Sequence, residues 1–272
     1  MEWFILLFIG LFTGAFGSLV GLGGGIIMVP SLLYLNSSGL LSDTIQPEDA
    51  VGISLVVIVI SAISSSVYYY KEGKIDVKSG LFFFSASGVT TILGSIATSY
   101  INIKAFYIFF GLLMIFITFL LSKKNTKPSQ ESKFPWDVQK VFINADGSEV
   151  EYGYNKKVAF LITAFAGFIG GVFGIGGGAI FVPMMVILFR FPPHIATATS
   201  MFIILLSTSI GSMTHIILGN VKFMYVLMLA PGAYIGGKIG SNIAKKISSQ
   251  GLIKLLRIVI ILVAIQMIYK GL

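Results

Sequence analysis

Two stretches decide the fold of this chain: Gly17-Ser-Leu-Val-Gly-Leu-Gly-Gly-Gly-Ile-Ile-Met-Val-Pro30 and Gly170-Gly-Val-Phe-Gly-Ile-Gly-Gly-Gly-Ala-Ile-Phe-Val-Pro183. Eight of the 14 positions are identical, at an offset of 153 residues. At an offset of 146 the matches continue with Ala50/Ala196, Ser54/Ser200, Ser61/Ser207, Gly73/Gly219, Gly94/Gly240 and Ser95/Ser241. Self-similarity at a fixed spacing indicates that one unit has been duplicated.

The composition around these stretches is that of a chain surrounded by lipid. Hydrophobic residues make up 56% and charged residues 11%, whereas a soluble domain carries about 25% charged residues. Several uncharged runs reach the roughly 20 residues that a spanning helix needs. The first run has no basic segment before it, so we expect a retained helix and not a cleaved signal peptide.

Charged residues and cysteine narrow the function. All 11 acidic residues lie between Glu2 and Glu151, in predicted loops or at a terminus, and the chain has no cysteine. These features argue against a carboxylate proton relay, an intramembrane aspartyl protease, thiolate chemistry and most metal sites. The ten Lys and Arg residues after Glu151 have no acidic partner in their own half. We therefore expect a positive site, with no metal and no cofactor.

The pattern predicts an all-α membrane protein with five helical segments in each copy. The first copy, within residues 1–122, has segments at 3–22, 25–36, 48–70, 79–99 and 104–122. The second copy is assigned to residues 158–272. Its helical segments are predicted at 157–175, which begins at the last linker residue, and at 178–190, 193–218, 222–245 and 250–270. Residues 123–157 form a polar linker with a small β-hairpin around Asp146-Gly147.

Positively charged loops predict the orientation. With the linker in the cytoplasm, 14 Lys and Arg residues lie inside and three lie outside, and both termini lie outside. The first two segments of each copy must then form a hairpin that returns to its starting side. Equivalent loops of the two copies lie on opposite faces, so the copies form an inverted repeat, an architecture of secondary transporters.

The glycine runs are predicted to turn the chain inside the membrane. The short helix after each run covers about half of the hydrocarbon core. Non-helical backbone survives at that depth only beside protein or a water-filled cavity. The unpaired N–H groups that open each short helix would favour an anion, which makes Gly23, Gly24, Gly25, Gly176, Gly177 and Gly178 candidate site residues. Alternatively, the glycines serve only close helix packing, the role that we favour for Gly232, Gly236 and Gly240.

The motif G-x-G-G-G-x-x-x-V-P occurs twice, followed by Ala50-Val-Gly-Ile-Ser54-Leu and Ala196-Thr-Ala-Thr-Ser200-Met. It resembles the TauE/SafE family of sulfite and organosulfur anion exporters, over both membrane halves. The resemblance implies inner-membrane export of small anions such as sulfite or sulfoacetate. The family's typical A-x-G-T-S element has Thr before Ser; Thr199-Ser200 keeps it and Ile53-Ser54 does not. If these hydroxyls contact substrate, the second copy should contribute more.

Polar residues inside the spans complete the candidate site. Ser54, Thr197, Thr199 and Ser200 have hydroxyls that either donate to a sulfonate or bond back to their own helix. Lys238 either attracts the anion or extends toward the headgroups. His194 and His215 are candidates for proton coupling, the alternatives being a chain-positioning and an interfacial role.

These patterns favour a transporter that exports a small sulfur-containing anion by alternating access at the repeat interface. Two alternatives stay open: a passive anion channel, and a membrane-embedded scaffold that binds a partner through the linker. An enzyme is the weakest interpretation, because no nucleophile–base pair or metal cluster is visible. The partners that we expect are the small anion and the lipid bilayer, with no nucleic acid.

Overall fold

The computed structural model describes residues 2–122, 136–143, 149–244 and 249–272. In the first half, helices α1 (Glu2–Val20), α2 (Gly25–Ser37), α3 (Pro47–Lys71), α4 (Val77–Thr98) and α5 (Ile103–Ser122) follow one another. In the second half the helices are α6 (Lys156–Phe173), α7 (Gly178–Pro183), α8 (Pro193–Ile217), α9 (Phe223–Ile243) and α10 (Ser249–Gly271). Within these residues the chain is thus mostly helical, with ten α-helices, as the sequence predicted.

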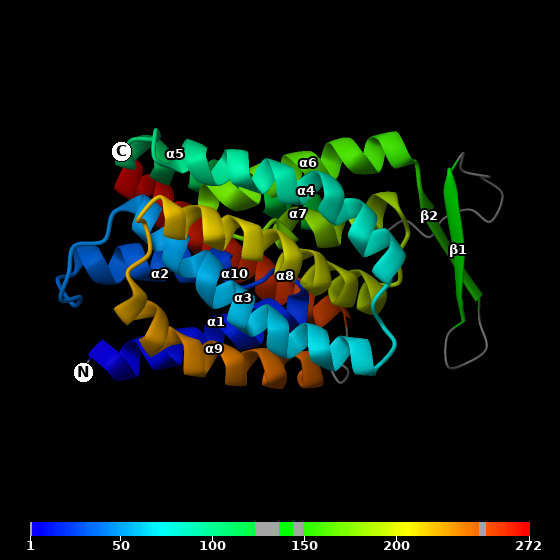
Figure 1. Cartoon of the computed structure of the whole chain (residues 1–272), viewed down its shortest axis with the longest axis horizontal. Coiled ribbons are helices and arrows are strands. Elements are labelled where there is room, and N and C mark those ends of the chain that lie inside the picture. The colour runs from blue at the N-terminus through cyan, green and yellow to red at the C-terminus, as the bar shows by residue number, and fades with distance from the viewer. Residues whose placement is uncertain (1, 123–135, 144–148, 245–248) are drawn as a thin grey trace.

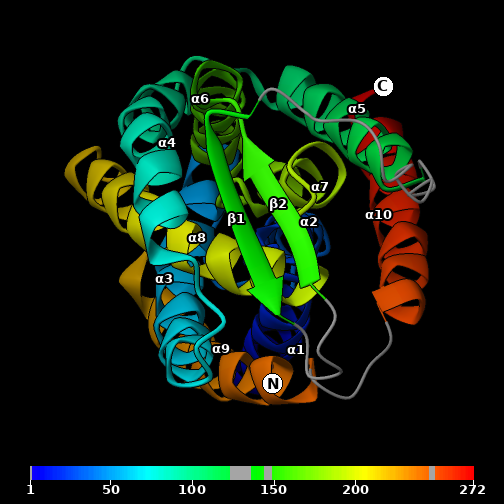
Figure 2. The ribbon, with the colours of Figure 1, turned by 90° about the vertical axis from the view of Figure 1, so that its right-hand side faces the viewer.

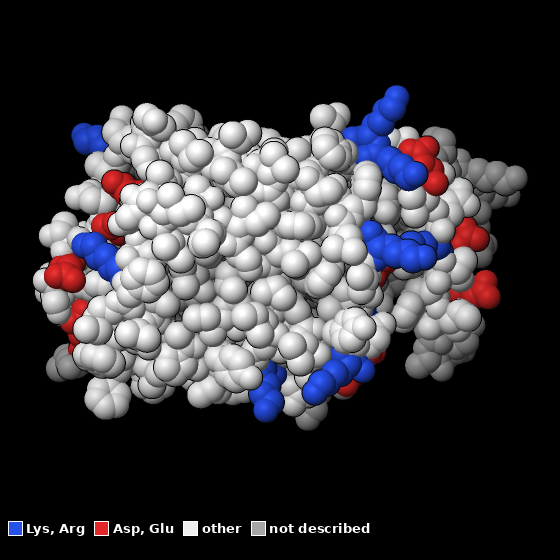
Figure 3. All heavy atoms as spheres, viewed as in Figure 1, with Lys and Arg blue, Asp and Glu red and all other residues white. Residues whose placement is uncertain are grey.

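The helices run side by side along the long axis of the molecule (Figure 1). Five of them, α1, α3, α4, α6 and α8, are long and apolar enough to cross a membrane by length and composition. On the face seen in Figure 3, Lys, Arg, Asp and Glu gather at the two ends and leave an uncharged band between them. This distribution fits a bundle whose middle faces lipid, because a charged side chain is costly there.

A β-hairpin joins the two halves. Strands β1 (Val138–Ile143) and β2 (Glu149–Tyr154) are antiparallel, with Val138 opposite Tyr154 and Ile143 opposite Glu149. The hairpin confirms the prediction for this segment, although the predicted turn at Asp146-Gly147 lies outside the described residues. It covers one end of the bundle, and both chain termini lie at the opposite end (Figures 1 and 2).

Helices of one half pack mainly on helices of the other. Helix α1 contacts α9 extensively, as α6 contacts α4; α3 packs on both α8 and α9, and α4 on α8. Helices α5 and α10 pair with each other at one side of the bundle (Figure 2). The buried hydrophobic residues form two clusters, and each cluster contains residues of both halves.

Glycine stripes allow the closest of these contacts. A Cβ added at Gly232, Gly236 or Gly240 of α9 would lie 2.0–2.2 Å from carbonyl oxygens of Leu7, Leu11 and Ala15 of α1. No real Cβ sits at such a distance, so only glycine lets these two backbones touch. The packing role predicted for the three glycines is confirmed.

One segment departs from the predicted α-helix over 178–190. Helix α7 ends at Pro183 and continues as a π-helical turn (η1, Met184–Leu188), closed by a hydrogen bond from the Phe189 N–H to the Met184 carbonyl. Proline removes one i→i−4 bond, yet Pro30 at the equivalent position leaves α2 continuous. The halves differ because the connection to α8 is shorter than the connection from α2 to α3. The second half must therefore reach its next helix over fewer residues.

Candidate functional site

The first backbone reversal lies between α1 and α2. The N–H groups of Gly21, Leu22 and Gly23 all donate to the Gly17 carbonyl, at 2.9, 2.9 and 3.3 Å. Gly21, Gly23 and Gly24 have φ between +79° and +89°, a range that only glycine adopts without strain. The run of glycines is thus required for the chain to reverse within a few residues.

The second reversal repeats this geometry between α6 and α7. Gly174, Gly176 and Gly177 have φ between +67° and +75°. The Ile175 N–H donates to the Gly170 carbonyl at 3.2 Å, as Leu22 does to Gly17 at the position 153 residues earlier. Both turns are buried inside the protein, as backbone away from water must be.

The two turns touch each other. A Cβ added at Gly25 would lie 2.1 Å from the Gly174 carbonyl oxygen, and one added at Gly178 would lie 2.7 Å from the Gly21 carbonyl oxygen. Each short helix therefore begins directly against the other half's turn. No anion fits at these two contacts unless the turns move apart.

Two serines hold the turns in place. The Ser54 hydroxyl on α3 donates to the Gly174 carbonyl at 2.8 Å, and the Ser200 hydroxyl on α8 donates to the Gly21 carbonyl at 2.6 Å. Both serines are wholly buried. Each bond crosses from one half to the turn of the other, and neither hydroxyl bonds back to its own helix, which was the alternative considered from the sequence.

The start of α2 presents unpaired donors next to this contact. Within the described residues, the backbone N–H groups of Gly24, Gly25 and Ile26 have no hydrogen-bond acceptor. These are the amides that a helix N-terminus leaves free, and they carry the positive end of its dipole. At the start of α7, the N–H groups of Gly178 and Ala179 are likewise unpaired.

Apolar side chains surround the turns. Ile58 on α3 and Ile204 on α8, which are 146 residues apart, both lie within about 3.7 Å of the Cβ positions of Gly23 and Gly176. The Thr208 methyl group also contacts the Gly176 position, at 3.0 Å. A site of this kind excludes water and strengthens the attraction between amide dipoles and a charge. Ile58 and Ile204 were not among the predicted site residues, although the repeat offset relates them.

The other predicted site residues lie at varying distances from the turns. Thr197 is beside the first turn, with its hydroxyl 3.5 Å from the Val20 carbonyl oxygen. The Thr199 hydroxyl accepts instead from the Asp76 N–H at 3.0 Å, on the other side of α8. Lys238 and His194 are exposed, so the structure does not bring either side chain to the turns. The position of Lys238 favours the alternative in which it extends toward the headgroups.

His215 is fully buried near the end of α8. Its Nδ1 lies 3.4 Å from the Asn220 side-chain nitrogen, and its Nε2 has no hydrogen-bond partner among the described residues. Tyr69, at the equivalent position of α3, is satisfied: its hydroxyl donates to the Ser18 carbonyl at 2.8 Å. The second half therefore has an imidazole that can bind a proton at the position where the first half has a tyrosine hydroxyl already engaged in a hydrogen bond.

No cluster of metal-binding side chains marks the turns among the described residues. Within the part of the chain that the structure describes, no three His, Asp or Glu side chains gather into a group that could hold a metal ion. A groove of about 440 Å³ runs between α1 and α2, but its lining is almost wholly apolar and includes the exposed rings of Phe4, Phe8 and Phe12. Such a groove fits lipid chains better than an anion.

Five helices long and apolar enough to cross a membrane, together with two buried backbone reversals in contact, fit a membrane transporter. The family model described as sulfite exporter TauE/SafE matches residues 6–267. The chain therefore belongs to this family of multi-pass membrane transporters, which are not enzymes.

Relatives support this assignment. The probable membrane transporter protein YunE of Bacillus subtilis is 42% identical over 272 residues, which cover 100% of this chain and 99% of the relative. A probable membrane transporter protein of Methanocaldococcus jannaschii is 26% identical over 260 residues, covering 91% and 88% of the two chains. A sulfite exporter TauE/SafE family protein of Arabidopsis thaliana matches 38% of this chain and 24% of its own, at 26% identity. No solved structure matches this chain.

Proposed function

We propose that this protein exports a small sulfur-containing anion, such as sulfite, sulfoacetate or a related sulfonate, across the cell's inner membrane. The observation that carries the proposal is the pair of glycine turns in direct contact, with the unpaired amides of Gly24, Gly25 and Ile26 beside them. The family description as sulfite exporter supports the chemical class of the substrate. The carrier works by alternating access, with no cofactor.

Two inverted repeats, residues 1–122 and 158–272, form the carrier, and residues 123–157 link them. Reciprocal contacts support this interpretation. Ser54 bonds to the turn of the second half and Ser200 to the turn of the first, and Gly25 and Gly178 touch the opposite turns in the same exchanged way. Exchanging the two halves would convert the Ser54–Gly174 contact into the Ser200–Gly21 contact, and the Gly25 contact into the Gly178 contact.

The hairpin end faces the cytoplasm and both termini face outward. The excess of positive charge at the hairpin end supports the orientation. It consists of residues in or next to the α3–α4 connection, the linker and the connection to α8: Lys71, Lys74, Lys78, Lys140 and Arg190. The N- and C-termini lie at the opposite end of the bundle (Figure 1).

Transport in this proposal begins when the turns separate. The anion enters the space that opens between Gly25 and Gly174, where the free amides of α2 and the dipole of that helix stabilise its charge. Ser200, Ser54 and Thr197 keep the turn backbones aimed at the anion and become available as donors once the turns part. Dehydration of the anion is offset by fixed amide dipoles in an apolar surrounding.

Proton coupling in this scheme belongs to His215, whose Nε2 is unpaired and buried. His194 is exposed and would act only at the cytoplasmic surface. An imposed pH gradient separates a coupled carrier from a passive channel. The carrier accelerates or reverses net sulfite movement according to the gradient, whereas a channel responds only to the sulfite gradient and the membrane potential.

Purified protein in proteoliposomes tests the proposal, with sulfite trapped inside and its release followed in time. We expect release above that of empty vesicles, slowed by about fivefold or more in Ser200→Ala and Ser54→Ala, because each variant leaves a buried turn carbonyl without its donor. Lys238→Ala is the control, since its side chain is exposed, and should change release less than about twofold. Release no faster than from empty vesicles would remove the proposed function.

A further inference from the structure

The β-hairpin between the halves is packed onto the end of the bundle. Its strands alternate: Val138, Lys140 and Phe142 are partly buried, whereas Gln139, Val141 and Ile143 face outward. On the second strand Tyr152, Gly153 and Tyr154 are all buried. A two-stranded hairpin has little stability of its own, so these contacts with the bundle fix its position.

Aromatic rings and one backbone bond attach the hairpin to the second half. Tyr152 packs on Phe191 with ring centroids 4.4 Å apart, and Tyr154 lies 5.7 Å from Phe189. The Gly153 N–H donates to the Phe189 carbonyl at 3.0 Å. Phe189 and Phe191 belong to the segment between η1 and α8, so the hairpin holds the entry to α8.

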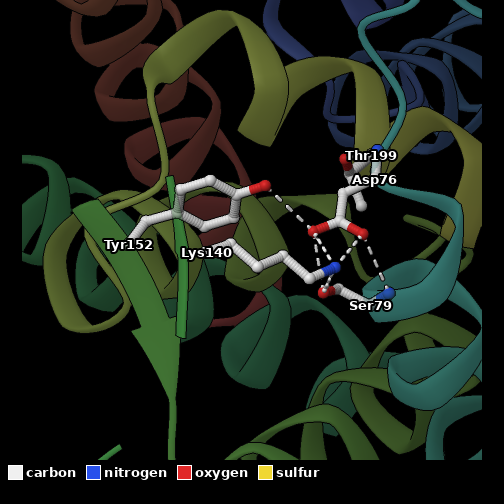
Figure 4. Close-up of polar contacts among 5 residues, drawn as sticks. All are labelled: Asp76, Ser79, Lys140, Tyr152 and Thr199. Atoms are coloured by element: carbon white, nitrogen blue, oxygen red, sulfur yellow. Dashed lines mark hydrogen bonds and ion pairs between the residues drawn. The ribbon is translucent and has the colours of Figure 1, made fainter. Parts of the chain in front are cut away.

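Tyr154 also packs on Phe83 of α4, in the first half, with ring centroids 4.8 Å apart. A buried carboxylate adds a polar attachment to the first half (Figure 4). Asp76, between α3 and α4, accepts from Lys140 Nζ at 2.5 and 2.7 Å and from the Tyr152 hydroxyl at 3.2 Å. The Ser79 hydroxyl also donates to Asp76, at 2.8 Å. The Asp76 side chain is 6% exposed and that of Lys140 is 25% exposed, which makes this a shielded ion pair.

Asp76 is also in contact with the second half. Its N–H donates to the Thr199 hydroxyl on α8 at 3.0 Å. One residue therefore joins the α3–α4 connection, both strands of the hairpin and α8. Apart from Thr199, the sequence pattern did not predict the members of this cluster, because they lie on three separate segments.

The other end of the bundle has an ion pair at the equivalent place but no hairpin among the described residues. Lys222 lies 146 residues after Asp76, and both residues directly precede an equivalent helix, α9 and α4. The Lys222 ammonium lies 3.6 Å from Asp49 at the start of α3 and donates to the Thr44 carbonyl. The two ion pairs therefore have reversed polarity. The residue before the helix is the anion in Asp76–Lys140 and the cation in Lys222–Asp49.

We propose that the hairpin is a latch that holds its end of the bundle closed through the Asp76–Lys140 pair, while Lys222–Asp49 closes the opposite end. This inference rests on the proposed function, since a carrier must open one end at a time. Loss of the cationic partner would leave the buried Asp76 carboxylate uncompensated, which is strongly destabilising. Removing Lys140 therefore weakens the attachment of the hairpin to the first half and favours opening of that end only.

Cysteine accessibility tests the latch, because the chain has no cysteine of its own. Ala196, in the first turn of α8, and Ala50, in the first turn of α3, are equivalent, wholly buried, and located at opposite ends. Each is replaced by cysteine in separate backgrounds, and labelling by a water-soluble maleimide is timed on purified protein in nanodiscs without substrate. Lys140→Met should speed labelling of Ala196→Cys at least tenfold and leave Ala50→Cys within twofold; Lys222→Met should do the reverse.

Two further variants decide between a latch and general loosening. Lys157→Met is the matched control, since Lys157 is exposed and forms no ion pair among the described residues, and its labelling should equal that of the parent. Lys140→Arg, which keeps a cation able to donate to the Asp76 carboxylate, should retain slow labelling of Ala196→Cys. Unchanged labelling in Lys140→Met, or equal acceleration at both ends, would overturn the latch. Because no transport is measured, this outcome is independent of whether sulfite is carried.

Discussion

At the scale of single residues, the repeat in the sequence relates Ser54 to Ser200 but does not reveal what either serine contacts. Both serines follow the glycine motif at matching positions and carry hydroxyls predicted to lie within the spans. In the structure each donates to a carbonyl of the opposite half's turn, at 2.8 and 2.6 Å. A one-dimensional pattern relates positions within the chain but cannot identify a partner 120 or 179 residues away.

Removing either serine hydroxyl should destabilise the protein by a similar amount. Ser54→Ala and Ser200→Ala each leave a buried carbonyl without a donor, which costs about 1–3 kcal/mol. Unfolding of purified protein measures the change. Ser209→Ala is the control: its exposed hydroxyl bonds only to the Leu205 carbonyl one turn back, and its loss should cost less than about 0.5 kcal/mol. A large cost for only one of the two serines would contradict the reciprocal role.

The ionisation of Asp76 sets the pH range over which the hairpin stays attached. Burial alone would raise the pKa of this carboxyl, but the hydrogen bonds from Lys140 and Ser79 outweigh it and hold the pKa below 3.8. Burial, and next the charge of Asp76, raise the pKa of the Tyr152 hydroxyl, so Tyr152 remains a donor at neutral pH.

A group with a lowered folded-state pKa stabilises the fold above its unfolded pKa and loses that effect as pH falls through the folded value. Trp136, directly before the hairpin, reports attachment in a Trp3→Phe background. Its fluorescence should stay constant between about pH 5 and pH 8 and shift to longer wavelength only below about pH 4. Asp76→Asn should show the shifted spectrum at neutral pH. A transition near pH 6 would assign the attachment to another group.

At the scale of helices, glycine spacing was the most informative feature of the sequence. The long segments were predicted to within a few residues, for example 48–70 against Pro47–Lys71 for α3. The stripe at Gly232, Gly236 and Gly240 was correctly interpreted as packing. The π-helical turn at Met184–Leu188 was not predicted, because it depends on the short connection to α8 and not on local preference.

Substitution in the glycine stripe should separate α9 from α1. A Cβ at Gly240 would lie 2.0 Å from the Ala15 carbonyl oxygen, so Gly240→Ala forces the helices apart. Overpacking of this kind costs about 1–3 kcal/mol, which a lower melting temperature in nanodiscs reports. Ile235→Ala on the same helix, at a side chain that is 51% exposed, should leave the melting temperature nearly unchanged. Equal stability of Gly240→Ala and the parent would show that the helices do not pack this closely.

At the scale of the whole molecule, the duplication was readable from the sequence but the contact between the halves was not. The offsets of 153 and 146 residues relate the two turns and the two serines. They do not show that the turns touch, or that the linker packs on the end of the bundle. These features arise from tertiary contacts between segments that share no local pattern.

The orientation of the whole molecule predicts on which side of the membrane a fused reporter protein lies. Alkaline phosphatase fused after Leu272 should be active, because the enzyme matures only outside the cytoplasm, and the same enzyme inserted between 144 and 148 should be inactive. Green fluorescent protein at the same two places should give the opposite pattern. Active phosphatase at the linker would invert the topology and would place the hairpin latch on the outer side.

Binding of a sulfur oxyanion to the purified protein tests the central claim most directly. A ligand that binds the folded state raises its stability by about 2.7 kcal/mol at 100 times its dissociation constant. The account predicts a saturable rise in melting temperature with sulfite or sulfoacetate, and no rise with chloride or acetate at equal ionic strength. No rise with any sulfur anion, or an equal rise with chloride, would contradict an anion site at the paired glycine turns.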